Sequence, residues 1–156
     1  VVAAEPIIEA ITAFNATAAL APAATGPMII EPLLASGELD ALCRDVIRPF
    51  YEERSRHAVD WLRDECRGLP LRIHRPEGAF FLWLWFPGLP VRSQELYRRL
   101  KARGVLVLSG HHFFPGLEEP WPHRDECLRI NCSQSPESVR AGIRLIGEES
   151  RRAYGA

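Results

Sequence analysis

Apolar residues recur near the start of the chain at the spacing of a helix. Ile7, Ile8, Ile11 and Phe14 would share one helical face. Pro6 suits the first turn of this helix, because its missing N–H would be unpaired there. The stretch 20–27 is rich in Ala and Pro and ends in Thr-Gly-Pro, so it predicts a break in the helical pattern.

A longer pattern runs from Glu38 to Cys66 and predicts a long helix. Its apolar positions share one face: Leu39, Leu42, Val46, Phe50, Leu62 and Cys66. Pro49 lies in the middle of this segment, where it removes a backbone hydrogen bond, so a kink is expected there. A bent helix of this length is suited to connecting two domains.

Two strands joined by a turn are expected next. Residues 71–75 alternate between apolar and polar types, and residues 79–86 are apolar on both faces, as in a central strand. Between them lies Pro-Glu-Gly, a turn in which Gly78 can take a positive φ angle. The two tryptophans of the second strand share one face and its other apolar residues the opposite face, and both faces are expected to be core.

The last part of the chain predicts two helices and two strands around a long loop. One helix is expected at 93–103, with Ser93 as N-cap and Gly104 closing it, and another after the N-cap Ser135. The strands, at 105–108 and 126–132, are short and apolar. The loop 109–125 is rich in Pro, Gly, His and aromatic residues, and loops of this length are usually functional or disordered.

The composition argues against two kinds of partner. Of the 156 residues 47% are hydrophobic and 25% charged, and the net charge is −1, so neither nucleic acid nor an anionic membrane surface is an expected partner. The apolar run 79–86 is far below the roughly 20 residues of a membrane span. The four cysteines show no Cys-x-x-Cys spacing, which favours a reducing cytoplasm over a disulfide scaffold.

Arg129 stands in the apolar strand segment Leu128-Arg129-Ile130-Asn131 and is the strongest candidate for a binding role. A buried arginine is costly unless it has an anion to bind, and its planar fork of donors matches a carboxylate. It could instead pair with a local acid such as Glu126, or face outward. Asn131 shares its strand face and could either orient Arg129 or cap the strand end.

His111, His112 and His123 raise the possibility of a metal site. Adjacent histidines on an extended segment point in opposite directions, and no acid or cysteine lies beside this pair at ligand spacing. No metal is therefore expected. The loop could equally be an ordered segment that is packed by its own aromatic residues.

Taken in order, these segments resemble the C-terminal small domain of pyridoxal-phosphate-dependent aminotransferases of fold type I, class I/II. The resemblance covers nearly the whole chain, and the segments 76–85, 100–107 and 113–122 are most similar to valine–pyruvate aminotransferases. It implies an α/β fold of the α+β kind, in which helices pack a small, mainly antiparallel sheet. Residues 1–35 would be the end of the large cofactor domain and an interface segment, and residues 36–156 the small domain with the kinked connecting helix 38–66.

The resemblance also implies roles for individual residues. Arg129 would bind the α-carboxylate of the substrate, with the turn residues Gly78 and Ala79 and the strand residue Asn131 nearby. Phe113 and one of His111 and His112 would line the substrate pocket. In a homodimer, Thr25 and Gly26 would approach the phosphate of the pyridoxal 5'-phosphate bound by the partner subunit.

The resemblance implies that the catalytic lysine lies elsewhere. The family's cofactor forms a Schiff base with a lysine, whereas the single lysine of this chain, Lys101, lies at a polar helix end. The chain is thus expected to contain no catalytic residue. It would be inactive alone, with the cofactor bound mainly by an upstream part of the enzyme.

The implied activity moves an amino group between a small aliphatic amino acid, of the valine or alanine type, and a 2-oxo acid such as pyruvate, in cytoplasmic amino-acid biosynthesis. No second in-strand arginine is seen near the loop, which favours aliphatic over acidic substrates. Two alternatives remain open: a non-catalytic module that binds a carboxylate or a protein partner, and another fold-type-I enzyme such as an amino-acid lyase.

Overall fold

The structure, a computed structural model, describes residues 2–18 and 24–155. The chain divides into two compact units, Val1–Cys43 and Arg44–Ala156. Residues 20–23 of the predicted break lie outside the described residues. No helix among the described residues is long and apolar enough to cross a membrane.

The described residues of the first unit form three helices: α1 (Glu5–Ala18), α2 (Thr25–Ala35) and α3 (Glu38–Leu42). Pro6 lies in the first turn of α1, as predicted. Thr25, Gly26 and Pro27 do not continue the predicted break but form the first turn of α2, a position that tolerates proline because its N–H needs no partner there. None of the described residues of this unit is buried. Its exposed large apolar side chains include Ile7, Phe14, Met28, Ile29 and Leu34.

The predicted helix 38–66 is observed as three consecutive segments. These are α3, the π-helical segment η1 (Cys43–Ile47) and α4 (Arg48–Glu65). The expected irregularity falls just before Pro49, which lies in the first turn of α4. A proline cannot donate the usual hydrogen bond to the preceding turn, and a π-helical turn is one way to absorb that loss.

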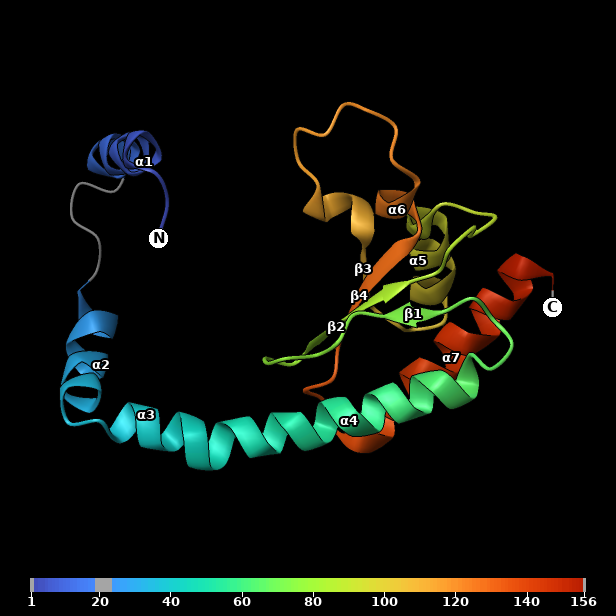
Figure 1. The fold of residues 1–156 in the computed structure, drawn as a ribbon, viewed down its shortest axis with the longest axis horizontal. Helices are drawn as coiled ribbons and strands as arrows, with labels where there is room; N and C mark the ends of the chain where they lie inside the picture. The colour runs from blue at the N-terminus through green and yellow to red at the C-terminus, as the bar shows by residue number, and fades with distance from the viewer. Residues whose placement is uncertain (1, 19–23, 156) are drawn as a thin grey trace. The chain divides into compact units, whose positions relative to one another are not determined.

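The second unit contains a four-stranded antiparallel sheet (Figure 1). Its strands are β1 (Arg72–Ile73), β2 (Phe81–Trp85), β3 (Leu108–Ser109) and β4 (Cys127–Asn131), in the spatial order β1-β2-β4-β3. The central place predicted for residues 79–86 is confirmed, because β2 lies between β1 and β4. The strand predicted at 105–108 is mostly wrong, since the Val105 N–H donates to Leu100 O and completes the end of the preceding helix.

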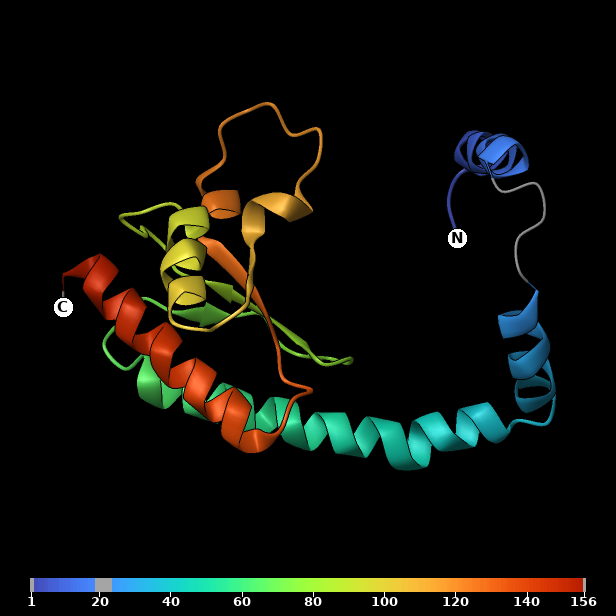
Figure 2. The ribbon, with the colours of Figure 1, turned by 180° about the vertical axis from the view of Figure 1, so that it is seen from behind.

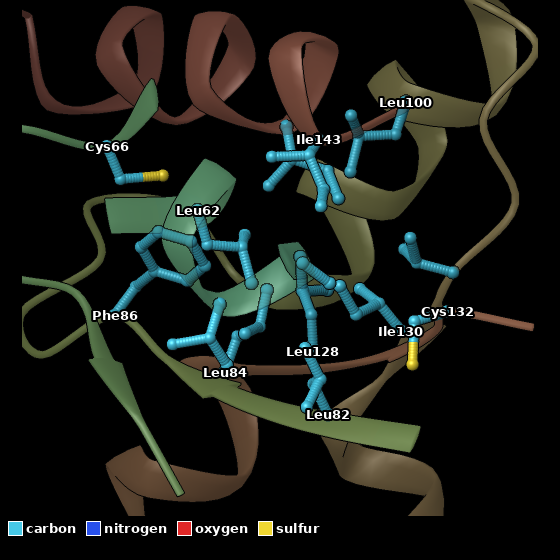
Figure 3. Packing of buried hydrophobic residues seen from close by; sticks show 14 of the residues in the cluster. Leu62, Cys66, Leu82, Leu84, Phe86, Leu100, Leu128, Ile130, Cys132 and Ile143 are labelled. Atoms are coloured by element: carbon cyan, nitrogen blue, oxygen red, sulfur yellow. The ribbon is translucent and has the colours of Figure 1, made fainter. Parts of the chain in front are cut away.

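Three helices cover one face of the sheet: α4, α5 (Ser93–Ala102) and α7 (Pro136–Tyr154). Helices α4 and α7 run side by side (Figure 2). Figure 3 shows side chains of β2 and β4 packed against those of the helices, and the buried core includes Leu62, Leu82, Leu84, Phe86, Leu100, Leu128, Ile130 and Ile143. The predicted N-cap Ser135 is confirmed, because its hydroxyl accepts from the Ser138 N–H.

The predicted N-cap Ser93 is wrong. Arg92 is the N-cap residue of α5, and the Ser93 hydroxyl is buried 2.7 Å from that of Ser109 at the end of β3. A tertiary hydrogen bond has therefore replaced the local cap. Gly104 does close the helix as expected, with φ 81°.

The second face of the sheet is not the full core that was predicted. Trp83 and Trp85 are only half-buried and Phe81 is 37% exposed. No helix of the α4, α5 and α7 layer covers these side chains; instead the loop after β3 lies over part of the face. This loop contains the short 3-10 helix η2 (Gly110–Phe113) and the short helix α6 (Pro122–Asp125).

The turn before β2 takes its unusual backbone conformation at Ala79 rather than at Gly78. Ala79 has φ 59°, and it is the one non-glycine residue of the described chain with a positive φ angle. Left-handed conformations cost a residue with a Cβ about 1–2 kcal/mol. The positive φ angle expected at Gly78 is therefore found one residue later, at Ala79.

Candidate functional site

Arg129 lies on the half-covered face of the sheet because side chains alternate along β4. Leu128 and Ile130 point into the helix-covered core, so Arg129 between them points the other way. Its guanidinium carbon lies 4.1 Å from the ring centroid of Phe81 and 4.8 Å from that of Phe113. The cation is thus half-buried between two aromatic rings.

The guanidinium of Arg129 has no hydrogen-bond or ion-pair partner in residues 2–18 and 24–155. The local acid considered as its partner, Glu126, is engaged elsewhere: Trp85 Nε1 donates to it at 2.8 Å and the Gly88 N–H at 2.9 Å. The donors of Arg129 therefore remain available to an external anion. A planar carboxylate matches this fork of donors in a bidentate arrangement.

Asn131 shares the strand face of Arg129 but forms its hydrogen bond elsewhere. Its Oδ1 accepts from the Ser133 N–H at 2.6 Å, a local turn that ends β4. Of the two roles considered for Asn131, the structure shows the strand-end cap. The exposed amide lies opposite Phe81 in the strand register.

The segment after β3 is fixed by a chain of hydroxyl groups. Ser93 Oγ lies 2.7 Å from Ser109 Oγ, and this atom lies 2.7 Å from His111 Nδ1. The burial of His111 lowers the pKa of its imidazole, and the neighbouring His112 lowers it further. The rings of His111 and His112 lie 3.9 Å apart, so the expectation that they point in opposite directions is wrong, because the segment is a 3-10 helix and not extended.

Phe113 ends this 3-10 helix, contacts Arg129 directly and belongs to an aromatic cluster. Its ring packs edge-on against Trp83, with centroids 5.1 Å apart and planes at 90°. Phe114, Trp121 and His123 extend the cluster without contacting Arg129. The site at Arg129 is therefore bounded by aromatic side chains.

Gly110 is a structural requirement of the site that the sequence reading missed. A Cβ at this position would lie 2.7 Å from Arg124 O and 2.8 Å from Cys127 Cβ. The 3-10 helix can therefore approach β4 only because residue 110 has no side chain. The signal in the sequence was a glycine directly after a short strand and before two histidines.

The turn residues Gly78 and Ala79 lie at the same end of the sheet as Asn131. The Cys132 N–H donates to Phe80 O at 3.0 Å, which ties the turn to the end of β4. A Cβ at Gly78 would meet nothing within 4 Å, so the turn is open on that side. The structure thus joins Arg129, Phe81 and Phe113 directly, and places the turn beside them at the strand end.

Residues that could hold a metal or a cofactor are few. No group of three or more His, Cys, Asp or Glu side chains in the described ranges is arranged to hold a metal ion. The side chain of Lys101 is exposed near the end of α5, with Nζ 6.0 Å from the ring centroid of Tyr97. Thr25 and Gly26 begin α2, where helix N–H groups favour a phosphate, and a Cβ at Gly26 would meet nothing within 4 Å.

Similarities to known proteins bear on the chain beyond its own geometry. No family model matches the sequence. The chain is 30% identical over 151 residues to the HTH-type transcriptional regulator TauR of Rhodobacter capsulatus, a match that covers 96% of this chain and 30% of the regulator.

The stronger similarities are to aminotransferases. The chain is 44% identical over 154 residues to the valine–pyruvate aminotransferase of Escherichia coli, which covers 99% of this chain and 37% of that enzyme. The crystal structure of valine-pyruvate aminotransferase AvtA from Salmonella typhimurium matches with a TM-score of 0.84 at 42% identity, over 99% of this chain and 40% of that one. The chain thus spans less than half the length of either enzyme. In sequence and in fold it corresponds to the C-terminal part of the fold-type-I aminotransferases.

Proposed function

We propose that this chain forms the C-terminal portion of a pyridoxal-phosphate-dependent aminotransferase. The enzyme would move an amino group between a small aliphatic amino acid, of the valine or alanine type, and a 2-oxo acid such as pyruvate. The observation that carries the proposal is Arg129, a half-buried guanidinium with no anionic partner in the described chain. The similarity to valine–pyruvate aminotransferases supports it.

Arg129 would bind the α-carboxylate of the amino acid through two parallel N–H···O contacts. Such a clamp fixes the direction of the Cα–H bond, and correct orientation is a large part of catalysis. Gly78, Ala79 and Asn131 would lie at the open end of this site, while Phe113 and His111 would belong to its loop side. The rings of Phe81, Phe113 and Trp83 favour an aliphatic substrate, because a second carboxylate would need a cation of its own.

The cofactor would be held mainly by residues outside this chain. When bound, pyridoxal phosphate supplies the electron sink for the reaction. Thr25 and Gly26 would contribute N–H groups of the α2 terminus to the phosphate of a partner subunit. Lys101 does not fit the role of the linking lysine, because its side chain is exposed to solvent, so this chain would contain no catalytic residue and would be inactive alone.

The first unit would serve as an interface segment. Residues 1–35 would be the end of the large domain, and residues 36–156 the small domain with its connecting helix. The large apolar side chains of α1 and α2 are exposed, and a homodimer partner together with the large domain would cover them. The four free cysteines are compatible with a cytoplasmic enzyme of amino-acid biosynthesis.

The test is Arg129→Ala in the complete aminotransferase. Losing one partner of a hydrogen-bonded charge pair costs about 2–5 kcal/mol, so the KM for valine should rise by roughly 30-fold or more while cofactor binding is retained. Arg129→Lys should also be poor, because the fork geometry is lost. Arg72→Ala is the matched control: Arg72 also lies over an aromatic ring, Trp85, but on β1. An unchanged KM in Arg129→Ala would remove this residue from the site.

A second candidate function is a carboxylate-binding module without catalysis, which the similarity to a transcriptional regulator favours. The expectation that the 156-residue chain is inactive alone is tested separately, by adding pyridoxal phosphate, reducing with borohydride and mapping the label. The aminotransferase proposal predicts no stoichiometric label on Lys101 and no turnover. A long upstream coding region with a lysine-bearing large domain would count against the module, whereas its absence would favour it.

A further inference from the structure

Phe81 and Phe113 reach the same guanidinium from the two sides of one strand. Phe81 lies on β2 and Phe113 follows β3, and β4, which carries Arg129, lies between these two strands. We infer that the two phenylalanines are positioning residues of the carboxylate site, which hold Arg129 in its binding geometry. This inference rests on the proposed role of Arg129.

Phe81 owes its place to the register of the sheet. It pairs with Asn131, so its ring lies diagonally across from Arg129 on the same face. The ring is 37% exposed and no helix covers it, although large apolar side chains usually gain most by burial. Its close neighbours are the Phe80 ring, 4.5 Å away between centroids, and the Arg129 guanidinium.

Phe113 owes its place to the anchored 3-10 helix. Gly110 allows the segment to lie against Cys127 and Arg124, and the hydroxyl of Ser109 fixes His111 two residues before Phe113. Trp83 packs against the Phe113 ring in a T-shaped arrangement. The 3-10 helix is thus held at three points, and its last residue contacts the cation.

Because aromatic rings rather than a carboxylate contact Arg129, its N–H donors remain available. A carboxylate beside Arg129 would consume N–H donors, whereas an aromatic ring attracts the cation through its π-electrons and consumes none. Two rings also cover part of the guanidinium, and this reduced contact with water strengthens its attraction to an incoming carboxylate. Arg129 is thereby fixed in place while its donors stay available.

The inference is tested by Phe81→Leu and Phe113→Leu in the complete aminotransferase. Each should raise the KM for valine by roughly 3- to 10-fold with little change in kcat, since one ring–cation contact is lost. Phe113→Tyr keeps the ring and should restore the wild-type KM. Phe114→Leu is the matched control, because Phe114 belongs to the same cluster, whereas the ring–cation contacts of Arg129 are to Phe81 and Phe113.

A second readout separates positioning from folding. Competitive inhibition by isobutyrate and by its neutral isostere isobutyramide reports how well the site prefers a carboxylate. This preference should fall in Phe81→Leu and Phe113→Leu but persist in Phe114→Leu and Phe113→Tyr. If the two phenylalanines only support the fold, their substitution should instead weaken the binding of both inhibitors by the same factor.

The outcomes also separate this inference from the proposed function. If Arg129→Ala raises the KM for valine and the two leucine variants leave both the KM and the carboxylate preference unchanged, the positioning role is overturned and the proposed function stands. An equal effect of Phe114→Leu would overturn it as well. If Arg129→Ala itself leaves the KM unchanged, the proposed function fails, and the inference fails with it.

Discussion

The residues of β2 and β4 alternate between two faces of the same sheet, and the two faces differ in what covers them and in the residue types they present. On the helix-covered face Leu82, Leu84, Leu128 and Ile130 are at most 4% exposed. On the opposite face the aromatic residues and Arg129 are half-covered by a loop. Because a shift of one residue would exchange the faces, the register that builds the core also presents the arginine.

The loop buries the Cys127 end of this face more completely than the end at Arg129 and Asn131. Cys127 shares the face of Arg129 but is completely buried under η2 and α6, and burial raises the pKa of its thiol to about 12. Two residues further along the strand, Arg129 is half-buried, and Asn131 is exposed. The face thus opens from the Cys127 end toward the Asn131 end, and the candidate site occupies the open half.

The sharpest test of the comparison uses adjacent residues on the two faces. Leu128→Ala should lower the free energy of unfolding by about 3 kcal/mol, because it leaves a cavity in a closed core. Arg129→Ala should lower it by less than about 1 kcal/mol, because only ring contacts are lost. Urea unfolding of both variants measures the difference. Equal losses would mean that both faces contribute to folding alike.

Gly110→Ala tests whether the loop cover depends on one close approach. The added Cβ would lie 2.7 Å from a backbone oxygen, so the segment must move, at a cost of about 1–3 kcal/mol in unfolding free energy. Gly142→Ala is the control, because in α7 its Cβ would meet only a Val105 methyl group at 3.9 Å. That variant should be neutral or slightly stabilised. A harmless Gly110→Ala would show that the loop is not tightly seated.

Ala79→Gly should have a smaller, opposite effect. Glycine adopts the left-handed conformation of this turn without the steric cost of a Cβ, so the unfolding free energy should rise by about 0.5–1 kcal/mol. The neighbouring exchange, Gly78→Ala, provides the comparison, since residue 78 has open space and no positive φ angle. Thermal unfolding measures the stability of both variants. If Ala79→Gly destabilises the protein, the left-handed conformation of Ala79 is not strained.

The smallest effect concerns the outer edge of the helix layer. A hydrogen bond from Arg103 lowers the pKa of Glu148 below its ordinary value of 4.5. A carboxyl whose pKa is lower when folded stabilises the fold above its unfolded pKa, and this contribution is lost as the pH falls through the folded pKa. Wild-type protein should therefore lose more thermal stability below about pH 4.5 than Glu148→Gln. Parallel pH curves would exclude the contribution.

Local sequence patterns determined most of the fold of the second unit. The helical repeat before Cys66, the Ser135 cap and the central apolar strand depend on residues close together in the chain, and all three are observed. Alternation along β4 also placed Arg129 opposite the core residues Leu128 and Ile130. These features follow from backbone geometry, which repeats every two residues in strands and every 3.6 in helices.

Only the tertiary structure decided what surrounds Arg129. Phe81 and Phe113 meet it because β2 and β3 flank β4, and Glu126 does not, because Trp85 and Gly88 occupy its carboxylate. The same dependence on distant partners moved Ser93 from a helix cap to a bond with Ser109. Such contacts join segments far apart in the sequence. Their energies depend on how the strands pair and which loops cover them, so local sequence patterns cannot predict them.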